Sequence, residues 1–401
     1  MIERRHRCAG VFLLRMMDRE YLLGVLKRKF GYDGFRPGQE EVVQTVLAGR
    51  DVLAVFPTGA GKSLCFQLPG LLLPGVTLVV SPLISLIKDQ TEALRRLGIG
   101  AVAIDSSMSH IQQSRHLSEV LRGEAKFLYV APERLASPFF REFCQKLRIS
   151  LLAVDEAHCV SQWGRGFRPE YSRIPGFVRV LGYRPVVAAF TATATGFVQK
   201  DILLRLDLPE ARLFVGEFVR PNLHFRVLRT ADKELALQGF LQRHRGESGI
   251  VYCATRNLVE EVTAFLRQQG RNAERYHAGL TPLERQHNQN GFLAGRCQIV
   301  VATNAFGLGI NKPDVRFVLH YNMPKDLESY YQEAGRAGRD GQDAECVLLY
   351  SPEDLELNRF LVGQSVTSDF SLKQDLERLR RMDEYCHQQG GWQDYLSDYF
   401  S

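Results

Sequence analysis

The sequence lacks the features of membrane proteins and of disulfide-stabilised proteins. No apolar run approaches the ~20 residues that span a bilayer. The first residues, MIERRHRCAGVFLLRM, resemble a signal peptide, but their apolar part, Ala9 to Leu14, is too short and lacks a small-residue cleavage pattern. The eight cysteines are scattered and include no CxxC pair. We therefore expect a cytoplasmic protein with reduced thiols and no membrane partner.

Neither sign of charge dominates the composition. The 51 Lys and Arg and 45 Asp and Glu residues give a net charge of +6, which alone is weak support for a nucleic-acid partner. The distribution says more, because residues 1–16 carry +3 and residues 352–401 carry −5, which leaves +8 on residues 17–351. A body with this charge attracts phosphate backbones. The 45% of hydrophobic residues is ordinary for globular domains with apolar cores.

From about residue 50 the chain alternates short apolar runs with helical patterns. The runs are apolar on both faces, which is typical of strands buried in a parallel sheet. They read DVLAVF, VTLVVS, KFLYVA, LLAVDE and VVAAFTAT, then, after residues 207–221, GIVYCAT, CQIVVAT, VRFVLHY and AECVLLY. Residues 82–97, 257–269 and 325–337 between the runs predict amphipathic helices. The pattern predicts an α/β protein with two parallel sheets, each covered by helices.

Four segments follow from this alternation. We expect a flexible leader at residues 1–16, a first α/β domain at 17–214, a second at 215–351 and a helical extension at 352–401. The extension has no strand pattern, and its stretch LKQDLERLRRMDEYC shows an apolar repeat of 3.6 residues.

The stretch VFPTGAGKS, residues 55–63, joins a predicted strand to a predicted helix. A glycine-rich loop in this position can wrap a triphosphate with backbone N–H groups at a helix N-terminus. Lys62 would reach the β- and γ-phosphates, and Ser63 could ligate Mg²⁺. The pattern GxxxxGK[ST] fails at its first position, Phe56, so a ligand-free turn is the alternative. The expected ATP-binding residues of the loop are Pro57, Thr58, Gly59, Ala60, Gly61, Lys62 and Ser63.

Two carboxylates end another predicted strand. LLAVDEAH places Asp155 at the carboxyl end of an apolar run, where open α/β sheets bind ligands. Asp155 is expected to be the second Mg²⁺ partner, through water, and Glu156 the base or positioner of the attacking water. Acidic residues at strand ends are often only solvated, but the phosphate loop upstream favours the catalytic interpretation.

These motifs are similar to those of superfamily 2 helicases. FGYDGFRPGQEEVV, SPLISLIKDQ, SQWGRGFRPEY, FTATAT, YHAGL, ATNAFGLGINKPDVRFVLHYNMP and YYQEAGRAGRDG, together with PTGAGKS and DEAH, resemble the RecQ family over residues 17–351, in order. The resemblance implies two tandem RecA-like domains, ATP and Mg²⁺, and single-stranded and tailed duplex DNA as partners. It also implies 3′→5′ movement and a role in DNA repair or recombination, with nucleoid association if the source is bacterial.

The resemblance assigns further residues to the nucleotide. Tyr32 would stack on adenine, and Arg36 and Gln39 would read it; a Gln can pair with the N6/N7 edge of adenine. Arg336 and Arg339 lie three apart and are expected on one face of the helix predicted at 325–337 and just beyond it. They would reach the γ-phosphate as arginine fingers, with Gln332 one turn earlier.

The loop after the two carboxylates has a DNA-sensing role in the family. By that resemblance Trp163 and Phe167 would stack on bases, and Arg165 and Arg168 would make phosphate or cation–π contacts. His158 would relay the contact to Glu156. A buried Trp is the alternative, although a loop with two glycines and two arginines is a poor core segment. The family usually has His-Asp where this chain has Arg165–Gly166, which leaves the strength of the coupling open.

Polar residues at other strand ends complete the expected site. By resemblance they line the DNA path or, for Thr191, couple it to hydrolysis, although each alone is more often a turn cap. They are Ser81, Thr191, Thr193, His277, Thr303, Asn311 and Lys312.

RecQ proteins usually continue into a module with four zinc-binding cysteines. Here Gly391 stands where the first ligand is expected, and Cys386 and His387 are adjacent, which is a poor spacing for tetrahedral zinc. We expect no zinc, and we expect ATP hydrolysis to survive without the module. The predicted function is a RecQ-type ATP-dependent DNA helicase. An RNA-remodelling DEAH-type ATPase and a non-unwinding DNA-binding scaffold are the alternatives.

Overall fold

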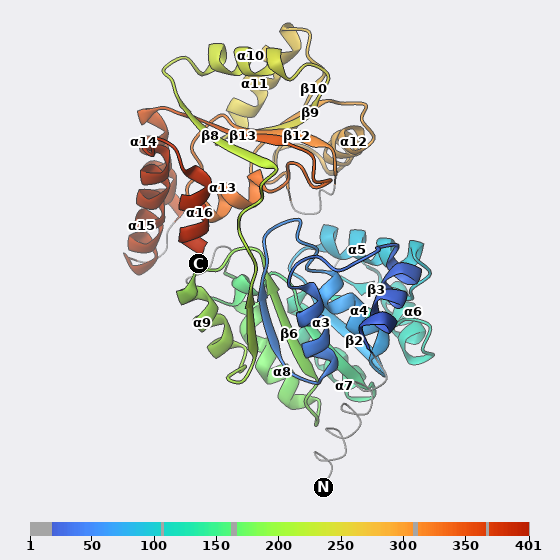
Figure 1. The fold of residues 1–401 in the computed structure, drawn as a ribbon. Helices are drawn as coiled ribbons and strands as arrows, with labels where there is room; N and C mark the ends of the chain where they lie inside the picture. The colour runs from blue at the N-terminus through green and yellow to red at the C-terminus, as the bar shows by residue number, and fades with distance from the viewer. Residues whose placement is uncertain (1–17, 106–107, 162–166, 308–311, 366–368, 401) are drawn as a thin grey trace. The chain divides into compact units, whose positions relative to one another are not determined.

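The apolar runs form two parallel sheets, each in its own compact unit (Figure 1). The computed structural model describes residues 18–105, 108–161, 167–307, 312–365 and 369–400. The chain divides into the units Met1–Gly216 and Glu217–Phe400. The first unit follows the colour scale from blue to green, and the second from green to red.

The first unit contains a seven-stranded sheet in the order β3-β4-β2-β5-β6-β1-β7. Every pairing in it is parallel. The register places Val55 of β1 opposite Thr191 of β6, so the loops after these strands start at the same edge. The strands are β1 (Val52–Val55), β2 (Val76–Val80), β3 (Ala101–Ile104), β4 (Phe127–Val130), β5 (Ile149–Val154), β6 (Val186–Thr191) and β7 (Arg212–Val215).

Helices of the first unit bury one face of this sheet in a shared core. Val52 and Ala54 of β1 point into it, and helices α2, α3, α4 and α5 supply apolar side chains from the other side. The helices are α2 (Arg19–Val25), the π-helix η1 (Leu26–Phe30), α3 (Gln39–Leu47), α4 (Leu64–Leu72), α5 (Ile84–Arg96), α6 (His110–Leu121), α7 (Pro138–Gln145), α8 (Ile174–Val180) and α9 (Gly196–Arg205). Short 3₁₀ turns are η2 (Pro132–Ala136), η3 (Ala157–Val160) and η4 (Pro169–Arg173).

The second unit contains a six-stranded parallel sheet in the order β10-β11-β9-β12-β13-β8. The strands are β8 (Leu223–Arg229), β9 (Ser248–Tyr252), β10 (Ala273–Tyr276), β11 (Ile299–Ala302), β12 (Val315–His320) and β13 (Ala344–Tyr350). Alternate residues enter separate cores: Val251 packs with α10 and α11 on one face, and Ile250 packs with α12 on the other. The sheet is therefore covered on both faces, as parallel sheets require.

Helices α10 (Lys233–Arg243), α11 (Arg256–Gln268), α12 (Pro282–Leu293) and α13 (Leu327–Ala334) cover this sheet. The C-terminal helices α14 (Pro352–Ser365), α15 (Asp369–Cys386) and α16 (Trp392–Phe400) gather beside β8 and α13 (Figure 1). Tyr399 donates to Glu328 on α13 over 2.9 Å, so the predicted helical extension packs onto the second unit. Within the described ranges, no helix is long and apolar enough to cross a bilayer.

One predicted helix is shorter than expected. The pattern at residues 325–337 predicts a single helix, and the arginines of the following motif were expected to continue one of its faces. In the structure α13 ends at Ala334, and residues 335–341 form turns. Glycines at 335, 338 and 341 weaken the helix, and Gly338 has a φ of 55° that a helix does not use. The prediction that Arg336 and Arg339 lie on one helical face is therefore wrong.

Candidate active site

The phosphate-loop motif lies between β1 and α4, as the strand–loop–helix pattern predicts. Gly59 and Gly61 have φ values of 87° and 80°, which disfavour any side chain there. Lys62 Nζ donates to the carbonyl oxygen of Phe56 over 3.0 Å and lies 3.4 Å from that of Pro57. Ser63 is the N-cap of α4, and its side chain makes no capping hydrogen bond. The backbone N–H groups at this helix start suit an anion.

The residues expected to read adenine contact the phosphate loop itself. Gln39 Nε2 donates to the carbonyl oxygens of Ala60 (2.9 Å) and Gly61 (3.1 Å). Gln39 Oε1 accepts from the backbone N–H of Arg36 over 2.9 Å, and the guanidinium of Arg36 donates to the carbonyl of Gly59. Tyr32 is 54% exposed, so its ring is open to a partner. The adenine assignment of these three residues stays a prediction, and Gln39 acts here as a brace of the loop.

The two carboxylates follow β5 directly. Asp155 is 6% exposed and accepts from the Ser81 hydroxyl (3.2 Å) and from the Glu156 N–H (3.0 Å). Burial, and then the neighbouring Glu156, raise the pKa of Asp155 to about 7, against the opposing effect of Lys62. Glu156 has a φ of 48°, a left-handed conformation that costs a non-glycine residue about 1–3 kcal/mol.

This donor set fits a Mg²⁺ ion. Carboxylate and hydroxyl oxygens are ligands that suit Mg²⁺. Asp155 supplies a carboxylate directly after β5, and Ser63 supplies a hydroxyl at the start of α4. A buried carboxylate whose pKa is raised by burial is one that a cation would return to its charged form. Among the described residues no group of three or more His, Cys, Asp or Glu side chains is arranged as a metal site.

A chain of polar contacts leads from Glu156 to the end of β6. His158 Nδ1 lies 3.3 Å from Glu156 Oε2 and 2.8 Å from the Thr191 hydroxyl. The Thr191 hydroxyl donates to the carbonyl oxygen of Thr193 over 3.3 Å and accepts from the Thr193 N–H over 3.4 Å. The predicted relay residue and two predicted strand-end threonines thus form one buried network.

The expected DNA-sensing loop is only partly described. Trp163 and Arg165 lie outside the described residues. Phe167 is 36% exposed, and the backbone N–H of Arg168 donates to the carbonyl of Cys159 over 2.8 Å. The loop therefore returns to η3, the turn that carries His158.

In the second unit the two predicted arginine fingers lie on the turn after α13. Arg336 is buried, and its guanidinium donates to the carbonyl of Gly307. A Cβ at Gly307 would collide with that guanidinium, so the glycine leaves room for it. Burial, followed by the charges of Arg336 and Arg220, lowers the pKa of Arg339 to about 9. Gln332, half-buried on α13, no longer shares a helical face with them.

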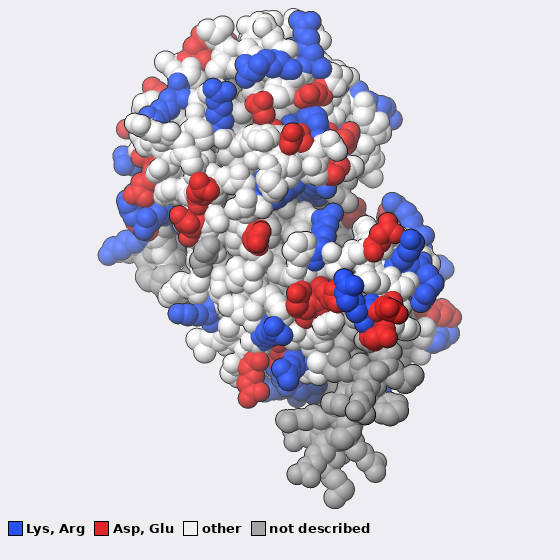
Figure 2. Space-filling model, viewed as in Figure 1, with Lys and Arg blue, Asp and Glu red and all other residues white. Residues whose placement is uncertain are grey.

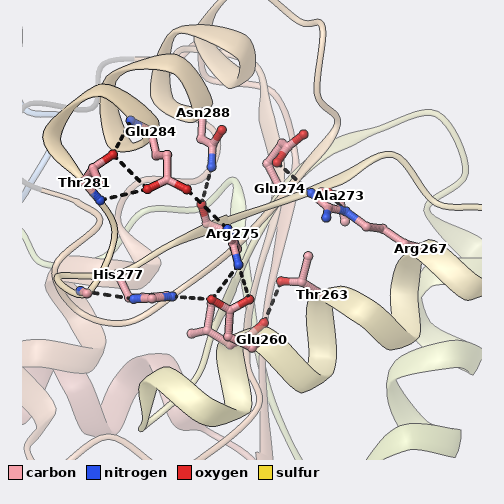
Figure 3. Close-up of polar contacts among 12 residues, drawn as sticks. Glu260, Thr263, Arg267, Ala273, Glu274, Arg275, His277, Thr281, Glu284 and Asn288 are labelled. Carbon is pink, nitrogen blue, oxygen red and sulfur yellow. Dashed lines mark hydrogen bonds and ion pairs between the residues drawn. The ribbon is translucent and has the colours of Figure 1, made fainter.

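The His277 side chain is hydrogen-bonded to other residues of the second unit (Figure 3). The backbone N–H of Gly279 donates to Nδ1 over 3.2 Å, so Nε2 carries the hydrogen donated to Glu260 over 2.9 Å. Arg275 makes two bonds to the same carboxylate, of 2.8 and 2.7 Å. Both ring nitrogens of His277 are thus used, and its assignment as a nucleic-acid contact stays a prediction.

The remaining residues predicted to line the DNA path are bonded to nearby groups of their own unit wherever the structure describes them. Lys312 is buried, pairs with Asp314 at 3.0 Å and lies over the ring of Phe292. The Thr303 hydroxyl accepts from the N–H of Ala305 over 3.4 Å, which is a turn cap. Asn311 lies outside the described residues. Ser81 is buried against Asp155, so its hydroxyl supports a carboxylate.

Sequence reasoning missed two kinds of residue. Tyr171 donates to the backbone carbonyl of Asp155 over 2.9 Å, and its position at the end of SQWGRGFRPEY was the available signal. Arg220 and Asn222 bind the turn of Arg336 and Arg339. They lie at the start of the second predicted domain, in a segment before its first predicted strand, so no periodicity pointed to them.

Comparison with known proteins identifies the class. The family model of DEAD/DEAH box helicases matches residues 36–202, and that of the helicase conserved C-terminal domain matches residues 232–341. Solved structures with the same fold include the DUF1998 helicase MrfA bound to DNA (TM-score 0.70, 21% identity, 86% of this chain and 53% of that one). Yeast Dbp5 bound to RNA and ADP BeF3 also matches (TM-score 0.64, 19% identity, 88% and 97%). The fold and the two matched models place the chain in the class of proteins with paired helicase domains, here two RecA-like units.

Similar sequences narrow this class to a family. An ATP-dependent DNA helicase RecQ from Synechocystis is 42% identical over 365 residues, 87% of this chain and 76% of the relative. RecQ from Bacillus subtilis is 45% identical over 377 residues, 94% of this chain and 64% of the relative. The chain therefore belongs to the RecQ family. It spans 64% and 62% of the lengths of the Bacillus and Haemophilus influenzae relatives.

Proposed function

We propose that this chain is an ATP-dependent DNA helicase motor of the RecQ type. It hydrolyses ATP, moves 3′→5′ on single-stranded DNA, opens tailed duplexes and serves DNA repair or recombination. The observation that carries the proposal is the network that joins Lys62, Asp155 and Glu156 through His158 to Thr191. Family membership supports DNA as the substrate.

Each residue of the network has a role in phosphoryl transfer. Lys62 and the loop N–H groups bind the β- and γ-phosphates. Asp155 and Ser63 would hold Mg²⁺, which when bound neutralises charge on the phosphate oxygens. Glu156 orients the attacking water and accepts its proton, and its left-handed backbone fixes the direction of its carboxylate.

The same network connects hydrolysis to nucleic acid. Phe167 and Arg168, with Trp163 and Arg165, bind single-stranded DNA by stacking and charge. A displacement of this loop moves η3 and hence the contact of His158 with Glu156. In the second unit Arg336 and Arg339 supply positive charge to the γ-phosphate in the transition state.

The surface charge favours DNA binding, although the described residues on the face shown in Figure 2 form no continuous basic patch. On the face shown in Figure 2, basic and acidic side chains are interspersed. The net charge of +8 on residues 17–351 nevertheless produces a long-range attraction for polyanions.

ATP turnover measured with the full chain tests the proposal. We expect stimulation by single-stranded DNA well above that by RNA of equal length and sequence, and no turnover by Lys62→Ala or Glu156→Gln with either. Equal stimulation by RNA would instead favour the RNA-remodelling ATPase. DNA binding by the wild-type chain without any turnover would favour the scaffold.

A further inference from the structure

The turn that carries the two arginines has little helical support of its own. Residues 335–341, here called the arginine turn, follow the end of α13. The N–H of Gly338 donates to the carbonyl of Val315 over 2.9 Å, and the N–H of Gly341 donates to that of Gly338 over 3.1 Å. Its carbonyl groups therefore need partners from outside α13.

Arg220 supplies two of these partners. Its Nη1 donates to the carbonyl of Gly335 over 2.9 Å, and its Nη2 donates to the carbonyl of Gly338 over 2.7 Å. The two carbonyls flank Arg336, so the planar guanidinium fixes the backbone on both sides of it. Lysine, with a single point charge on a flexible stem, cannot reproduce this fork.

Asn222 closes the other side of the turn. Its Nδ2 donates to the carbonyls of Gly338 and Gln342, each over 2.9 Å. A Cβ at Gly338 would lie 2.5 Å from that nitrogen, so the turn and Asn222 are fitted to each other. The N–H of Ala344 donates to the Asn222 carbonyl over 2.9 Å, which ties the contact to the start of β13.

The segment that bears Arg220 is itself anchored. Gln393 of α16 donates to the Arg220 carbonyl over 2.9 Å. The Phe218 ring stacks on Phe400 at 4.9 Å between centroids, and the hydroxyl of Tyr331 on α13 donates to the Phe218 carbonyl over 2.7 Å. This segment begins at Phe218, two residues after Gly216, where the first unit ends and the second begins.

Arg220 is thus placed to act through the turn. Both of its terminal nitrogens are bonded to carbonyl oxygens. Its charge also lies near Arg339 and contributes, after burial and Arg336, to the lowered pKa of that residue. Three guanidiniums lie near one another here, and two of them, Arg220 and Arg336, are bonded to carbonyl oxygens. A bound polyanion would relieve the repulsion among their charges.

We infer that Arg220, assisted by Asn222, is a positioning residue that holds the arginine turn in the conformation in which Arg336 and Arg339 meet the γ-phosphate of ATP. The inference rests on the proposed function. In addition, the segment that follows the first unit fixes the positions of Arg336 and Arg339 through the side chain of Arg220. A displacement of a catalytic group by about 1 Å can cost on the order of 10²-fold in rate.

The test is steady-state ATP turnover by the full chain with saturating single-stranded DNA. We expect Arg220→Ala to lower kcat by about 10²-fold and Arg220→Lys by about tenfold, with KM for ATP within about threefold of wild type. The control is Arg226→Ala on β8, whose side chain is exposed; its kcat should equal that of wild type. Wild-type kcat in Arg220→Ala would overturn the inference. If Arg220→Ala does not fold, Asn222→Ala tests the inference instead, and we expect its kcat to fall by about tenfold.

A double-mutant cycle separates positioning from general damage. Arg336→Ala alone should lower kcat by about 10³-fold. Adding Arg220→Ala should then cost much less than the 10²-fold expected when Arg336 is present, because Arg339 is the one finger left for Arg220 to position. A further independent 10²-fold loss in the double variant would show that Arg220 does not act through Arg336. Wild-type turnover by Arg336→Ala would remove the finger role itself, and with it the proposed function on which the inference rests.

Discussion

At the scale of single residues, Asp155 combines burial with a position beside a second carboxylate. Burial and Glu156 raise its pKa to about 7, and Lys62 acts in the opposite direction. A proton and a divalent cation therefore compete for the same oxygens near neutral pH. At limiting Mg²⁺, hydrolysis should therefore weaken as the pH falls below about 7, because protons then compete with the ion for Asp155.

The raised pKa also predicts how stability depends on pH. Between the ordinary carboxyl pKa of about 4 and about 7, the folded protein binds more protons at Asp155 than the unfolded chain does. Folding is therefore disfavoured as the pH rises through this window, by up to about 1.4 kcal/mol per pH unit. Asp155→Asn removes this effect. Without Mg²⁺, its Tm should exceed that of wild type at pH 8, and the difference should shrink toward pH 5.

Thermal unfolding monitored by circular dichroism measures that difference. The control is Asp398→Asn, at an exposed position on α16, which should show a small and constant difference. A gap between Asp155→Asn and wild type that does not change from pH 5 to pH 8 would contradict the prediction.

A second prediction at this scale concerns Thr191. Its hydroxyl is the contact between His158 and Thr193, and Thr191→Val removes it with little change of shape. We expect the ratio of DNA-stimulated to unstimulated ATP turnover to fall by about tenfold, as for loss of about 1.4 kcal/mol of coupling. Thr195→Val, at the N-cap of α9 where no side-chain capping bond is made, is the matched control. An unchanged ratio in Thr191→Val would show that Thr191 does not couple DNA binding to hydrolysis.

At the scale of helices and strands, sequence patterns found the interior of each sheet and missed the edges. Each of the nine apolar runs corresponds to an interior strand. The edge strands β3, β7, β8 and β10 were not predicted. Three of them are partly exposed, as in β7, where Leu213 and Val215 are more than a third exposed. A pattern that requires apolar residues on both faces therefore overlooks them.

The candidate site likewise has a part that the sequence predicted and a part that it did not. The phosphate loop and Asp155–Glu156 follow interior strands, and their motifs predicted a location that the fold provides. Other parts of the site depend on contacts between residues far apart in the sequence or on local turns. Arg220 contacts the arginine turn over 115 and 118 residues, and His277 contacts Glu260 over 17 residues. Such contacts leave no periodicity in the sequence, so only the structure reveals them.

The helices after β13 yield a prediction about stability. Asp354 of α14 pairs with Lys233 of α10 at 2.6 Å, with side chains 3% and 11% exposed, and it accepts from Asn322 over 2.9 Å. Removing one partner of a buried ion pair costs about 3–5 kcal/mol, so Asp354→Ala should strongly destabilise the second unit. Urea unfolding measures the change.

An exposed pair on the neighbouring helix is the control for this prediction. Glu377 pairs with Arg380 at 2.6 Å, and both side chains are about half exposed. Glu377→Ala should therefore cost less than about 1 kcal/mol. Equal losses for the two variants would show that the Asp354 pair does not tie α14 to the unit.

At the scale of the whole molecule, two sheets in separate units each present strand-end loops, and the proposed motor uses both. The phosphate loop and the carboxylates belong to the first unit, and the arginine turn belongs to the second. Because residues 17–351 carry a net charge of +8, affinity for single-stranded DNA should fall with salt. The slope of log K against log salt should be about −0.7 for each phosphate contacted.

Strand displacement tests the proposed direction. With ATP and Mg²⁺, we expect the full chain to separate a duplex with a 3′ single-stranded tail faster than one with a 5′ tail, and Lys62→Ala to separate neither. Since the chain spans 64% of its Bacillus relative, translocation is measured in parallel by release of streptavidin from biotinylated single strands. Streptavidin release from the 3′ end but not the 5′ end would contradict 3′→5′ movement. Release from the 5′ end without duplex separation would show that the motor is present and that opening the duplex needs a part of the relatives beyond this chain.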